Sequence, residues 1–526
     1  MVRVIPKPNS IMEKIGTYQF DKCLVKNEFE KNNKFINECL LEYSIEQGDK
    51  ENLLFLKDNT LAKEEYYLVV NNEGVRILAS TEVGAFYGLQ TFKQMLNDST
   101  TLPYVEIKDK PRFTYRSFMM DEARHFFGMD VIKEMLDMMA LLKLNRFHWH
   151  LTDDQGWRVE IKKYPLLTEK GTTRKSTTVA WKESTSRTTP IRDGKEYGAG
   201  CFYTQEQLKE IVAYAKERYI EICPEIDMPG HLIAAISCYP ELSCFNEKVD
   251  VSENWGIMDT IGCCGKEPLY TFVKDVIAEL SEVFPSEYFH IGGDEVPKIK
   301  WKKCPDCQKK IQELGLKNEH ELQGYFNNQI MEYLESFGKR TIAWNEILNA
   351  DGVSDKTIVQ FWVGLPKLNG VNKWLEKGNN VIVSKCTNLY MDYYYAMEDI
   401  KKSYNTDLSS SGLDKKYEKQ VLGFEAPLWS EYVSSKDKLE FQVFPRLMSL
   451  AEINWTNPEN KNFKSFMDRL DNINTLLDSK SINYARKDEC YPTGINGLKR
   501  RAKWGTEWCG KPLLEYERCL ENRKNQ

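Results

Sequence analysis

The sequence contains no run of about 18 apolar residues, the length that a membrane-spanning helix requires, so it predicts no transmembrane segment and no membrane partner. Its first residues, MVRVIPKPNS, include no apolar stretch long enough for a signal peptide. We therefore expect the chain, as given, in the cytoplasm, or outside the cell if a signal was removed. There is also no excess of basic residues: 72 Lys and Arg against 78 Asp and Glu give a formal net charge of −6, which argues against a nucleic-acid partner.

Several motifs of catalytic chemistry are also missing. No GxGxxG or Walker sequence is present, so nothing indicates a bound dinucleotide or nucleoside triphosphate. No HExxH spacing indicates a metal-dependent protease, and no serine lies in a GxSxG elbow. These absences predict an enzyme without a cofactor, if the chain is an enzyme at all.

The cysteines do not form a recognisable metal motif. Among 14 cysteines, Cys304 and Cys307 make one CxxC pair, and Cys263 and Cys264 are adjacent. A zinc site requires a second well-spaced ligand pair, so we expect no metal here. Reduced loop thiols are the expected state in a cytoplasmic protein, with a disulfide as the alternative.

What is present indicates a folded protein with several parts. Of the 526 residues, 41% are hydrophobic and 29% are charged, as in soluble globular proteins. Residues 1–110 resemble a small α+β domain: runs at 66–70 and 74–78 predict two strands joined by a polar turn, and a helix is expected over 84–96. Lys110-Pro111 marks the boundary.

From Tyr115 onward, short apolar runs alternate with helical patterns. Alternation of this kind predicts a parallel sheet, and eight such units within one domain predict a (β/α)8 barrel over residues 111–460. An open doubly wound sheet is the alternative. After it, residues 461–526 are expected to add a helix at 462–477 and a tail packed on the barrel. The eight runs are 115–121, 146–152, 219–226, 288–292, 340–344, 357–363, 380–385 and 421–428, and the intervening helices are expected at 130–142, 205–217, 268–284, 319–337 and 371–377, with Thr204 and Gln207 forming a capping box.

Acidic, basic and aromatic residues follow every predicted strand. A barrel of this type carries its chemistry at the C-terminal ends of its strands, so these side chains are expected to converge. Carboxylates and an arginine bind sugar hydroxyls, and tryptophan rings pack against the apolar face of a pyranose. In chain order the candidates are Arg124, Asp153, Asp154, Asp227, His231, Asp294, Glu295, Trp344, Trp362, Tyr390, Asp392, Trp429 and Glu431.

The adjacency of Asp294 and Glu295 narrows the reaction. Most glycosidases use two carboxyl groups about 5–10 Å apart on opposite sides of the scissile bond, which neighbouring residues can hardly provide. The pair suits a different division of labour: Glu295 protonates the leaving oxygen, and Asp294 holds a group on the substrate. If that group is a 2-acetamido substituent, its carbonyl oxygen can act as the nucleophile.

The motifs together resemble glycoside hydrolase family 20, the β-N-acetylhexosaminidases. The matching stretches, in order from about residue 86 to 452, are FYGLQTF, MDEARHF, NRFHWHLTDDQGWRVEI, PEIDMPGH, YFHIGGDEVP, AWNEI, YMDYYY, APLWSEY and PRLMSLAE. The resemblance implies a small N-terminal domain before a catalytic barrel. It also implies a retaining exo-glycosidase that removes terminal β-linked GlcNAc or GalNAc with help from the substrate's own 2-acetamido group.

The resemblance implies a role for each candidate. Glu295 would be the general acid and base, Asp294 would orient the acetamido nitrogen, and Tyr390 would bind its oxygen. The remaining roles are hydroxyl recognition by Arg124, Asp392 and Glu431, a pocket wall of Trp344, Trp362 and Trp429, and support of the acid by Asp153, His231 and Asp227. No metal takes part, the partner is a carbohydrate, and a homodimer is possible.

Two other functions remain open from the sequence. A catalytically silent sugar-binding protein on the same scaffold would have lost its acid, whereas Glu295, Asp294 and Tyr390 are all present. A glycosidase that releases a disaccharide instead of a monosaccharide would keep the same motifs. The stretch from about 170 to 200, rich in Ser, Thr, Lys and Gly, is expected to be a long loop over the mouth of the site.

Overall fold

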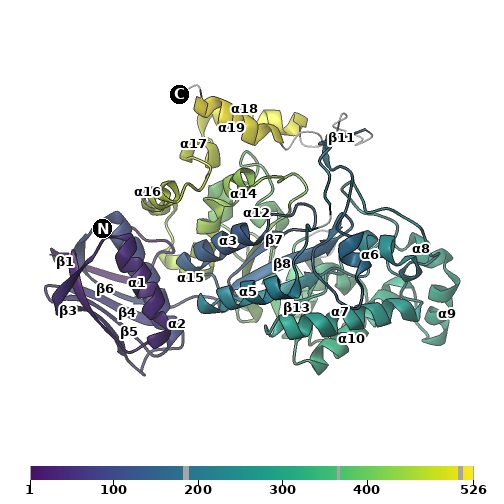
Figure 1. Cartoon of the computed structure of the whole chain (residues 1–526), viewed down its shortest axis with the longest axis horizontal. Helices are drawn as coiled ribbons and strands as arrows, with labels where there is room; N and C mark the ends of the chain where they lie inside the picture. The colour runs from purple at the N-terminus through teal and green to yellow at the C-terminus, as the bar shows by residue number, and fades with distance from the viewer. Residues whose placement is uncertain (1, 182–188, 199, 364–367, 508–512, 525–526) are drawn as a thin grey trace.

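The computed structural model describes residues 2–181, 189–198, 200–363, 368–507 and 513–524 (Figure 1). The N-terminal part is a six-stranded sheet in the order β1-β6-β4-β5-β3-β2, with helices packed against it. Its elements are β1 Ser10–Gln19, β2 Lys22–Asn27, α1 Asn33–Glu42, β3 Glu46–Lys57, β4 Tyr66–Asn71, β5 Gly74–Ala79, α2 Glu82–Asp98 and β6 Thr101–Asp109.

The predicted hairpin is confirmed as β4 and β5. Alternate residues of β4 are buried, as expected for a strand with one face on a core. At the turn, Gly74 has φ of +131°, and a Cβ there would lie 2.2 Å from the Asn52 carbonyl oxygen, so only glycine fits. The following helix, α2, is capped by Thr81, whose side chain accepts a hydrogen bond from the Gly84 backbone nitrogen.

The second part is a closed barrel of eight parallel strands, which confirms the predicted (β/α)8 fold and excludes the open sheet. The strands pair in the order β12-β13-β14-β15-β16-β17-β7-β8, and β8 pairs with β12 to close the ring. All eight predicted runs are strands. Their bounds are β7 Ser117–Asp121, β8 Arg146–Asp153, β12 Glu221–Ile226, β13 Tyr288–His290, β14 Arg340–Trp344, β15 Ile358–Phe361, β16 Val381–Val383 and β17 Val421–Leu428.

The predicted helices lie around this ring. Their observed ends differ from the predicted ends by at most a few residues. Helix α5 is capped as predicted: the Thr204 side chain accepts from the Gln207 nitrogen, and the Gln207 side chain accepts from the Thr204 nitrogen. The long helices are α3 Met129–Leu141, α5 Gln205–Glu217, α7 Glu267–Val283, α10 Glu319–Ser336, α11 Leu368–Glu376 and α16 Phe463–Ser479. No helix in the described part of the chain is both long enough and apolar enough to cross a bilayer.

The remaining elements lie around the barrel and in the C-terminal region. They are β9 Gly156–Trp157, α4 Leu166–Glu169, β10 Thr178–Trp181, β11 Pro190–Arg192, α6 Ile233–Cys238, α8 Ile299–Lys303, α9 Pro305–Glu313, α12 Cys386–Leu389, α13 Ile400–Tyr404, α14 Lys436–Val443, α15 Arg446–Trp455, α17 Lys487–Cys490, α18 Gly494–Glu507 and α19 Leu513–Lys524.

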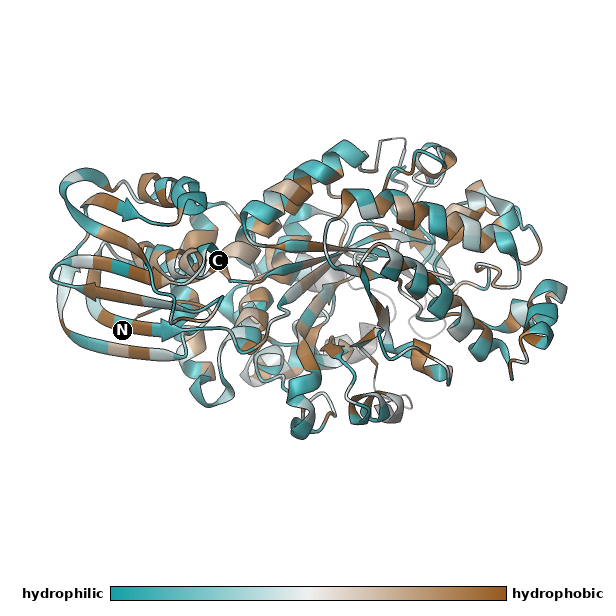
Figure 2. Cartoon of the chain, turned by 90° about the horizontal axis from the view of Figure 1, so that it is seen from below, coloured by the Kyte–Doolittle hydropathy of each residue, from teal (hydrophilic) through white to brown (hydrophobic). Residues whose placement is uncertain are grey.

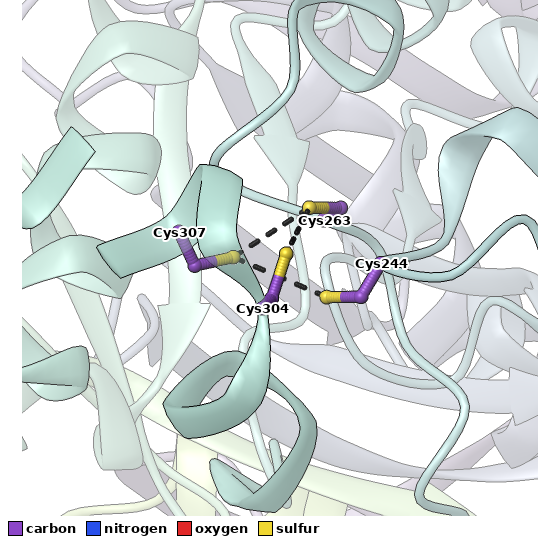
Figure 3. A group of neighbouring side chains, drawn as sticks. All are labelled: Cys244, Cys263, Cys304 and Cys307. Atoms are coloured by element: carbon purple, nitrogen blue, oxygen red, sulfur yellow. Dashed lines mark hydrogen bonds between the residues drawn. The ribbon is translucent and has the colours of Figure 1, made fainter. Parts of the chain in front are cut away.

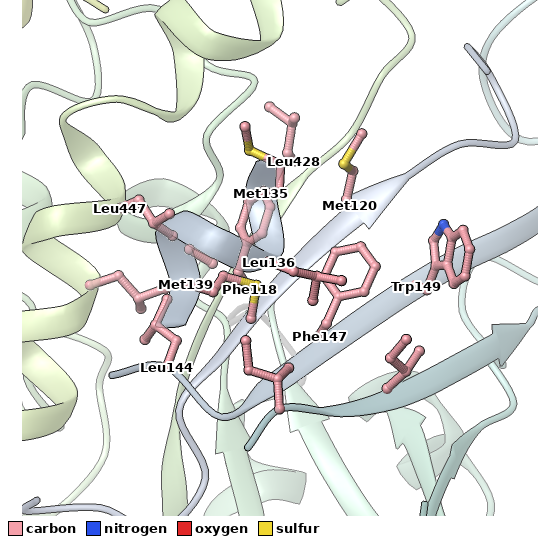
Figure 4. Close-up of a cluster of buried hydrophobic side chains, with 14 of the residues drawn as sticks. Phe118, Met120, Met135, Leu136, Met139, Leu144, Phe147, Trp149, Leu428 and Leu447 are labelled. Atoms are coloured by element: carbon pink, nitrogen blue, oxygen red, sulfur yellow. The ribbon is translucent and has the colours of Figure 1, made fainter. Parts of the chain in front are cut away.

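Two apolar layers hold the barrel together. Outside the strands, side chains of α3 such as Met135 and Met139 pack against Phe118 of β7 and Phe147 of β8 (Figure 4). The outer helices show hydrophilic and hydrophobic stripes, as helices covering a core do (Figure 2). Inside the barrel a separate cluster, formed by Tyr115, Cys223, Tyr288, Ile342, Ile358 and Ile382, lies near the beginnings of the strands. This packing closes one end of the barrel, so a substrate must enter at the C-terminal ends of the strands.

A buried polar seam joins the N-terminal part to the barrel. The Lys143 ammonium group donates to the Tyr66 hydroxyl at 2.9 Å and lies 3.5 Å from the Asp109 carboxylate. Trp455 donates its indole N–H to the same carboxylate at 2.8 Å. Nearby, the Arg116 guanidinium makes two hydrogen bonds, 2.9 and 3.2 Å long, to the Glu64 carboxylate. Charges contributed by one part are therefore neutralised by the other.

Candidate active site

The strand ends bring the predicted site residues together at one end of the barrel. The turn after β13 carries Asp294 and Glu295, and three consecutive strands, β7, β8 and β12, supply Arg124, Asp153 and His231. The remaining candidates follow β14 (Trp344), β15 (Trp362), β16 (Tyr390 and Asp392) and β17 (Trp429 and Glu431). The contacts described below connect these side chains to one another.

The turn after β13 has an unusual backbone that aims its two acids. Gly292, Gly293 and Glu295 have φ values of +65°, +93° and +47°. A Cβ on Gly292 would lie 1.8 Å from Asp227 Oδ1, and the same oxygen accepts a hydrogen bond from the Gly293 nitrogen at 3.1 Å. A non-glycine residue with positive φ costs about 1–3 kcal/mol, and such strain concentrates at functional sites. The Asp227 carboxylate therefore fixes the turn through its hydrogen bond to Gly293 and its close contact with Gly292.

Asp294 is a buried carboxyl group with an unused acceptor. Its exposed fraction is 8%, and its Oδ1 atom has no hydrogen-bond partner among the described residues. Burial raises its pKa to about 7, and the nearby Glu346 and Glu295 carboxylates also raise it, although His231 lowers it. Buried polar atoms are almost always paired, so this oxygen is suited to accept an N–H from a ligand.

Glu295 is linked through His231 to Asp153. His231 Nε2 lies 3.7 Å from Glu295 Oε2, and on the opposite side of the ring Nδ1 lies 3.2 Å from Asp153 Oδ1. Burial lowers the pKa of His231, but the Asp153 carboxylate more than compensates and holds it well above the ordinary value. Asp154 also approaches Nδ1, at 3.4 Å, and accepts the Ile233 backbone N–H. Asp153 thus makes the closer of the two contacts.

Arg124 is held by three neighbours. Its guanidinium lies 2.7 Å from Asp153 Oδ2, donates to Asp121 Oδ2 at 3.2 Å and donates to Gln155 Oε1 at 3.0 Å. Its Cζ atom also lies 5.0 Å from the centre of the Trp429 ring. The sequence did not single out Asp121 or Gln155. Asp121 is the last residue of β7, and this position in a barrel strand is the signal that could have identified it.

Four aromatic side chains form a connected group. The Tyr390 ring stacks on Trp362 with centroids 6.1 Å apart, and it lies 6.2 Å from Trp429. Trp429 in turn lies 5.9 Å from Trp344. Trp344 is only 1% exposed, because it also donates its indole N–H to the carboxylate of Glu225 at 2.8 Å. The structure therefore places Trp344 deepest of the predicted wall residues.

Asp392 and Glu431 are two carboxyl groups near each other. Burial, and after it the nearby Glu431 charge, raise the pKa of Asp392 to about 8. Burial also raises the pKa of Glu431, although Arg124 opposes this. The Oδ1 atom of Asp392 has no hydrogen-bond partner within the described residues. These groups are ready to bind hydroxyl donors from a ligand.

A layer of histidines lies beneath the site and was not predicted as such. Three histidine ring nitrogens lie close to carboxylate oxygens of Glu225 on β12. The nitrogen–oxygen distances are 2.5 Å for His150, 2.9 Å for His290 and 3.0 Å for His148. His148 and His150 point inward because alternate residues of a strand face the same side. His148, Glu225 and His290 offer atoms of the kind that bind metals. The three rings nevertheless all face one carboxylate, and His150 is hydrogen-bonded to it.

The long loop begins beside Arg124. Arg174 donates to the backbone oxygens of Arg124 and Gln155, the latter at 2.7 Å. Beyond it, β10 and β11 pair antiparallel, and Thr178 donates its backbone N–H to Glu253 at 3.0 Å. Residues 182–188 and 199 of the loop lie outside the described residues.

Comparison with known proteins agrees with this geometry. Residues 113–458 match the model of glycosyl hydrolase family 20, catalytic domain, and residues 1–110 match glycosyl hydrolase family 20, domain 2. A β-hexosaminidase of Porphyromonas gingivalis is 38% identical over 520 residues, which cover 92% of this chain and 64% of that protein. A β-hexosaminidase of Vibrio furnissii is 35% identical over 74% of this chain and 65% of its own length. The chain thus spans just under two thirds of the length of these two relatives.

Solved structures give the same result. An exo β-N-acetylglucosaminidase of the same family from Vibrio harveyi, in complex with N-acetylglucosamine, matches with a TM-score of 0.80 at 30% identity, over 92% of this chain and 78% of that one. A β-N-acetylhexosaminidase from Streptomyces coelicolor A3(2) matches with a TM-score of 0.79 at 27% identity, over 94% of this chain and 99% of that one.

Proposed function

The chain belongs to glycosyl hydrolase family 20, and on this basis we propose that it is an exo-acting β-N-acetylhexosaminidase. It removes terminal non-reducing β-linked GlcNAc or GalNAc from a glycan or a chito-oligosaccharide. The reaction proceeds with retention of configuration and uses the substrate's own 2-acetamido group as the nucleophile. Neither a metal ion nor an organic cofactor takes part in the chemistry.

One observation carries this proposal: the Asp294 carboxyl group is buried beside Glu295 and keeps one unpaired oxygen. An unpaired oxygen at this position supports recognition of an amide N–H. Asp294 then holds the acetamido group so that its carbonyl oxygen lies near the anomeric carbon, where proximity supplies a large effective concentration. As the new C–O bond forms, positive charge develops on the amide nitrogen, and the Asp294 carboxylate stabilises it.

Glu295 acts as the proton donor in the first step. Its carboxyl group gives a proton to the glycosidic oxygen while the bond from that oxygen to the anomeric carbon breaks, and a cyclic oxazoline intermediate forms from the sugar. A water molecule then attacks the anomeric carbon while Glu295 takes its proton, and the bond from that carbon to the oxazoline oxygen breaks. The acetamido group is restored, and the enzyme returns to its starting state. His231 and Asp153 support Glu295 from the side away from the substrate.

The other candidates recognise the terminal sugar. Arg124, Asp392 and Glu431 bind its hydroxyl groups, and Tyr390 donates to the acetamido oxygen. Trp362, Trp344 and Trp429 surround the acetamido group and the sugar ring. The unpaired Asp392 oxygen and the fixed Arg124 guanidinium support this assignment.

The test is a panel of aryl β-glycosides of GlcNAc, GalNAc, glucose and galactose. We expect hydrolysis of the two N-acetylated substrates, a β-configured sugar as the first product by NMR, and strong inhibition by a cyclic thiazoline. Chito-oligosaccharides should shorten by one sugar at a time. Comparable hydrolysis of β-glucosides, release of a disaccharide, or a sugar trapped on a protein carboxylate would each overturn the proposal.

A further inference from the structure

Four cysteines from two separate loops meet in the protein interior (Figure 3). Cys244 and Cys263 lie in the connection between β12 and α7, whereas Cys304 and Cys307 lie in the connection that follows β13. All four are buried, with exposed fractions of 5% for Cys244 and 0% for the others. Their sulfur atoms all lie within 4.8 Å of one another.

Three of the six distances between the sulfur atoms match the edges of a tetrahedron around one metal ion, and the other three are within 4.8 Å. The measured separations are 3.5 Å for Cys263 and Cys307, 3.7 Å for Cys263 and Cys304, and 3.9 Å for Cys244 and Cys307. Four thiolates bound to zinc at about 2.3 Å would be separated by about 3.8 Å. A disulfide bond would need about 2.05 Å. None of the four cysteines forms a disulfide bond.

The backbone around the cluster prepares two ligand pairs. Cys304 caps α9 and Cys307 lies in its first turn, which is the CxxC pair seen in the sequence. The second pair is produced by folding: Ser243 and Gly262 form an antiparallel bridge, and the Cys263 nitrogen donates to Leu242 at 2.8 Å. This bridge places Cys244 beside Cys263, although the two are far apart in the chain.

A glycine allows the two pairs to approach. A Cβ on Gly265 would lie 2.3 Å from the Cys307 backbone nitrogen, so the Cys263 loop can pass the start of α9 only without a side chain there. The backbone of the two loops is therefore in close contact beside the cluster, and the four side chains direct their sulfur atoms toward one another (Figure 3).

We propose that Cys244, Cys263, Cys304 and Cys307 bind a structural zinc ion. The expectation of no metal rested on the missing second pair, which the fold supplies. Binding replaces four thiol protons with one Zn²⁺, so four protons are released and no oxidation occurs. All four coordination positions are taken by protein, as in structural rather than catalytic zinc sites. An iron–sulfur cluster would need wider separations, because its inorganic core lies between the ligands.

The ion would join the two loops that carry the catalytic residues. Gly262, next to Cys263, donates its backbone N–H to Pro229 at 2.8 Å, two residues before His231. Trp301, three residues before Cys304, donates its indole N–H to Gly262 at 3.0 Å. These two hydrogen bonds connect the loop that carries His231 to the loop that carries Asp294 and Glu295, at a position away from the site itself. This inference does not depend on the substrate or on the mechanism proposed above.

The experiment is metal analysis of the purified full-length protein. The chain is expressed in zinc-supplemented medium, purified under reducing conditions, and analysed by inductively coupled plasma mass spectrometry. We expect about one zinc ion per chain, and X-ray absorption should show four sulfur neighbours at about 2.3 Å. Addition of a mercurial that modifies thiols should release the same amount of zinc, measured with a colorimetric chelator.

Variants separate ligation from general damage to the interior. Cys304→Ser with Cys307→Ser should reduce the zinc content at least tenfold and lower Tm. Cys264→Ser is the control, because Cys264 is as deeply buried as Cys304 and Cys307 and is adjacent to Cys263, but it lies outside the four-sulfur group. It should keep its zinc. Wild-type protein that takes up no zinc even after refolding with it, iron in its place, mapped disulfides among the four, or zinc retained by the double variant would each overturn the proposal.

Discussion

Nε2 of His231 lies 3.7 Å from Oε2 of Glu295, so a buried imidazole directs its outer nitrogen at the proposed acid. Its inner nitrogen faces the Asp153 carboxylate at 3.2 Å. The Asp153 carboxylate therefore acts on Glu295 through the charge of the ring between them. The protonation of His231 can be measured separately from catalysis, and this makes the arrangement testable.

Replacement of Asp153 by Asn should lower the pKa of His231. In the wild type this pKa is raised well above 6.5, so the charged pair stabilises the fold fully below about pH 6.5. That contribution is lost as pH rises through the raised value. Titration of the histidine signals by NMR measures the change, and the exposed His320 is an internal control. An unchanged midpoint for His231 would contradict the assigned pair.

Replacement of Glu295 by Gln should lower kcat about 100- to 10,000-fold, because the amide cannot protonate the leaving oxygen. The loss should be smaller for aryl substrates whose leaving groups need little protonation. Glu287→Gln is the control, since Glu287 is exposed just before the same strand, at the opposite end of the barrel. Equal, mild losses on all substrates would remove Glu295 from this role.

Replacement of Asp294 by Asn should reduce activity and yet stabilise the fold at alkaline pH. The folded-state pKa of Asp294 is raised to about 7, chiefly by burial. Its neutral form is therefore favoured in the folded state, and stability is lost as pH rises toward 7. The loss begins near the ordinary value of 3.8 and is complete above about 7. Asparagine avoids burying that charge, so the gain in Tm over the wild type should be largest at pH 8, smaller at pH 5 and nearly absent below the ordinary value. Lower stability at pH 8 would show that the carboxylate is favourably paired.

Asp294 should also control the acidic side of the pH profile. Because the ionised carboxyl group stabilises the developing positive charge, kcat/KM of the wild type should fall as pH drops below about 7. The Asn variant should lose this dependence. Steady-state rates on an aryl GlcNAc substrate from pH 4 to 9 provide the measurement, and an identical acidic limb in both proteins would contradict it.

Replacement of Gly292 by Ala should displace the catalytic turn. The new Cβ would meet Asp227 Oδ1 at 1.8 Å, and the φ of +65° is unfavourable for alanine. A shift of about 1 Å in catalytic groups can cost about 100-fold in rate. Gly315→Ala is the matched control: its φ is +62°, and no atom lies within 4 Å of the added Cβ. Similar activity in the two variants would mean that the turn tolerates the methyl group.

The barrel and most of its site could be predicted because both leave local patterns. Strands buried on both faces are continuous apolar runs, and all eight were identified. Side chains at their C-terminal ends must converge in a barrel, so chain position alone grouped Arg124 with Glu295. In the N-terminal sheet, the edge strand β1 and the strand β3, which lies between β5 and β2, were missed. The residues of β1 and of the segment EQGDKE in β3 are mostly exposed and polar.

Features that depend on long-range packing were not predictable. Glu225 lies in an apolar run, and only the closed barrel shows that three histidines converge on it. Cys244 belongs to no motif, and its place beside Cys263 results from a bridge between distant residues. Spacing rules require ligands close in sequence and cannot detect such a pair.

The polar seam between the two parts of the chain limits which N-terminal domains can be joined to this barrel. Lys143 and Arg116 of the barrel are almost fully buried and are neutralised by Asp109 and Glu64 of the N-terminal part. Removal of one partner from a buried ion pair typically costs about 3–5 kcal/mol, a large share of a domain's stability. A recombination event that replaced only the first 110 residues would have to bring both acids with it. A chimera that joins this barrel to a different N-terminal sheet should therefore fold stably only if that sheet supplies carboxylates at the positions of Asp109 and Glu64.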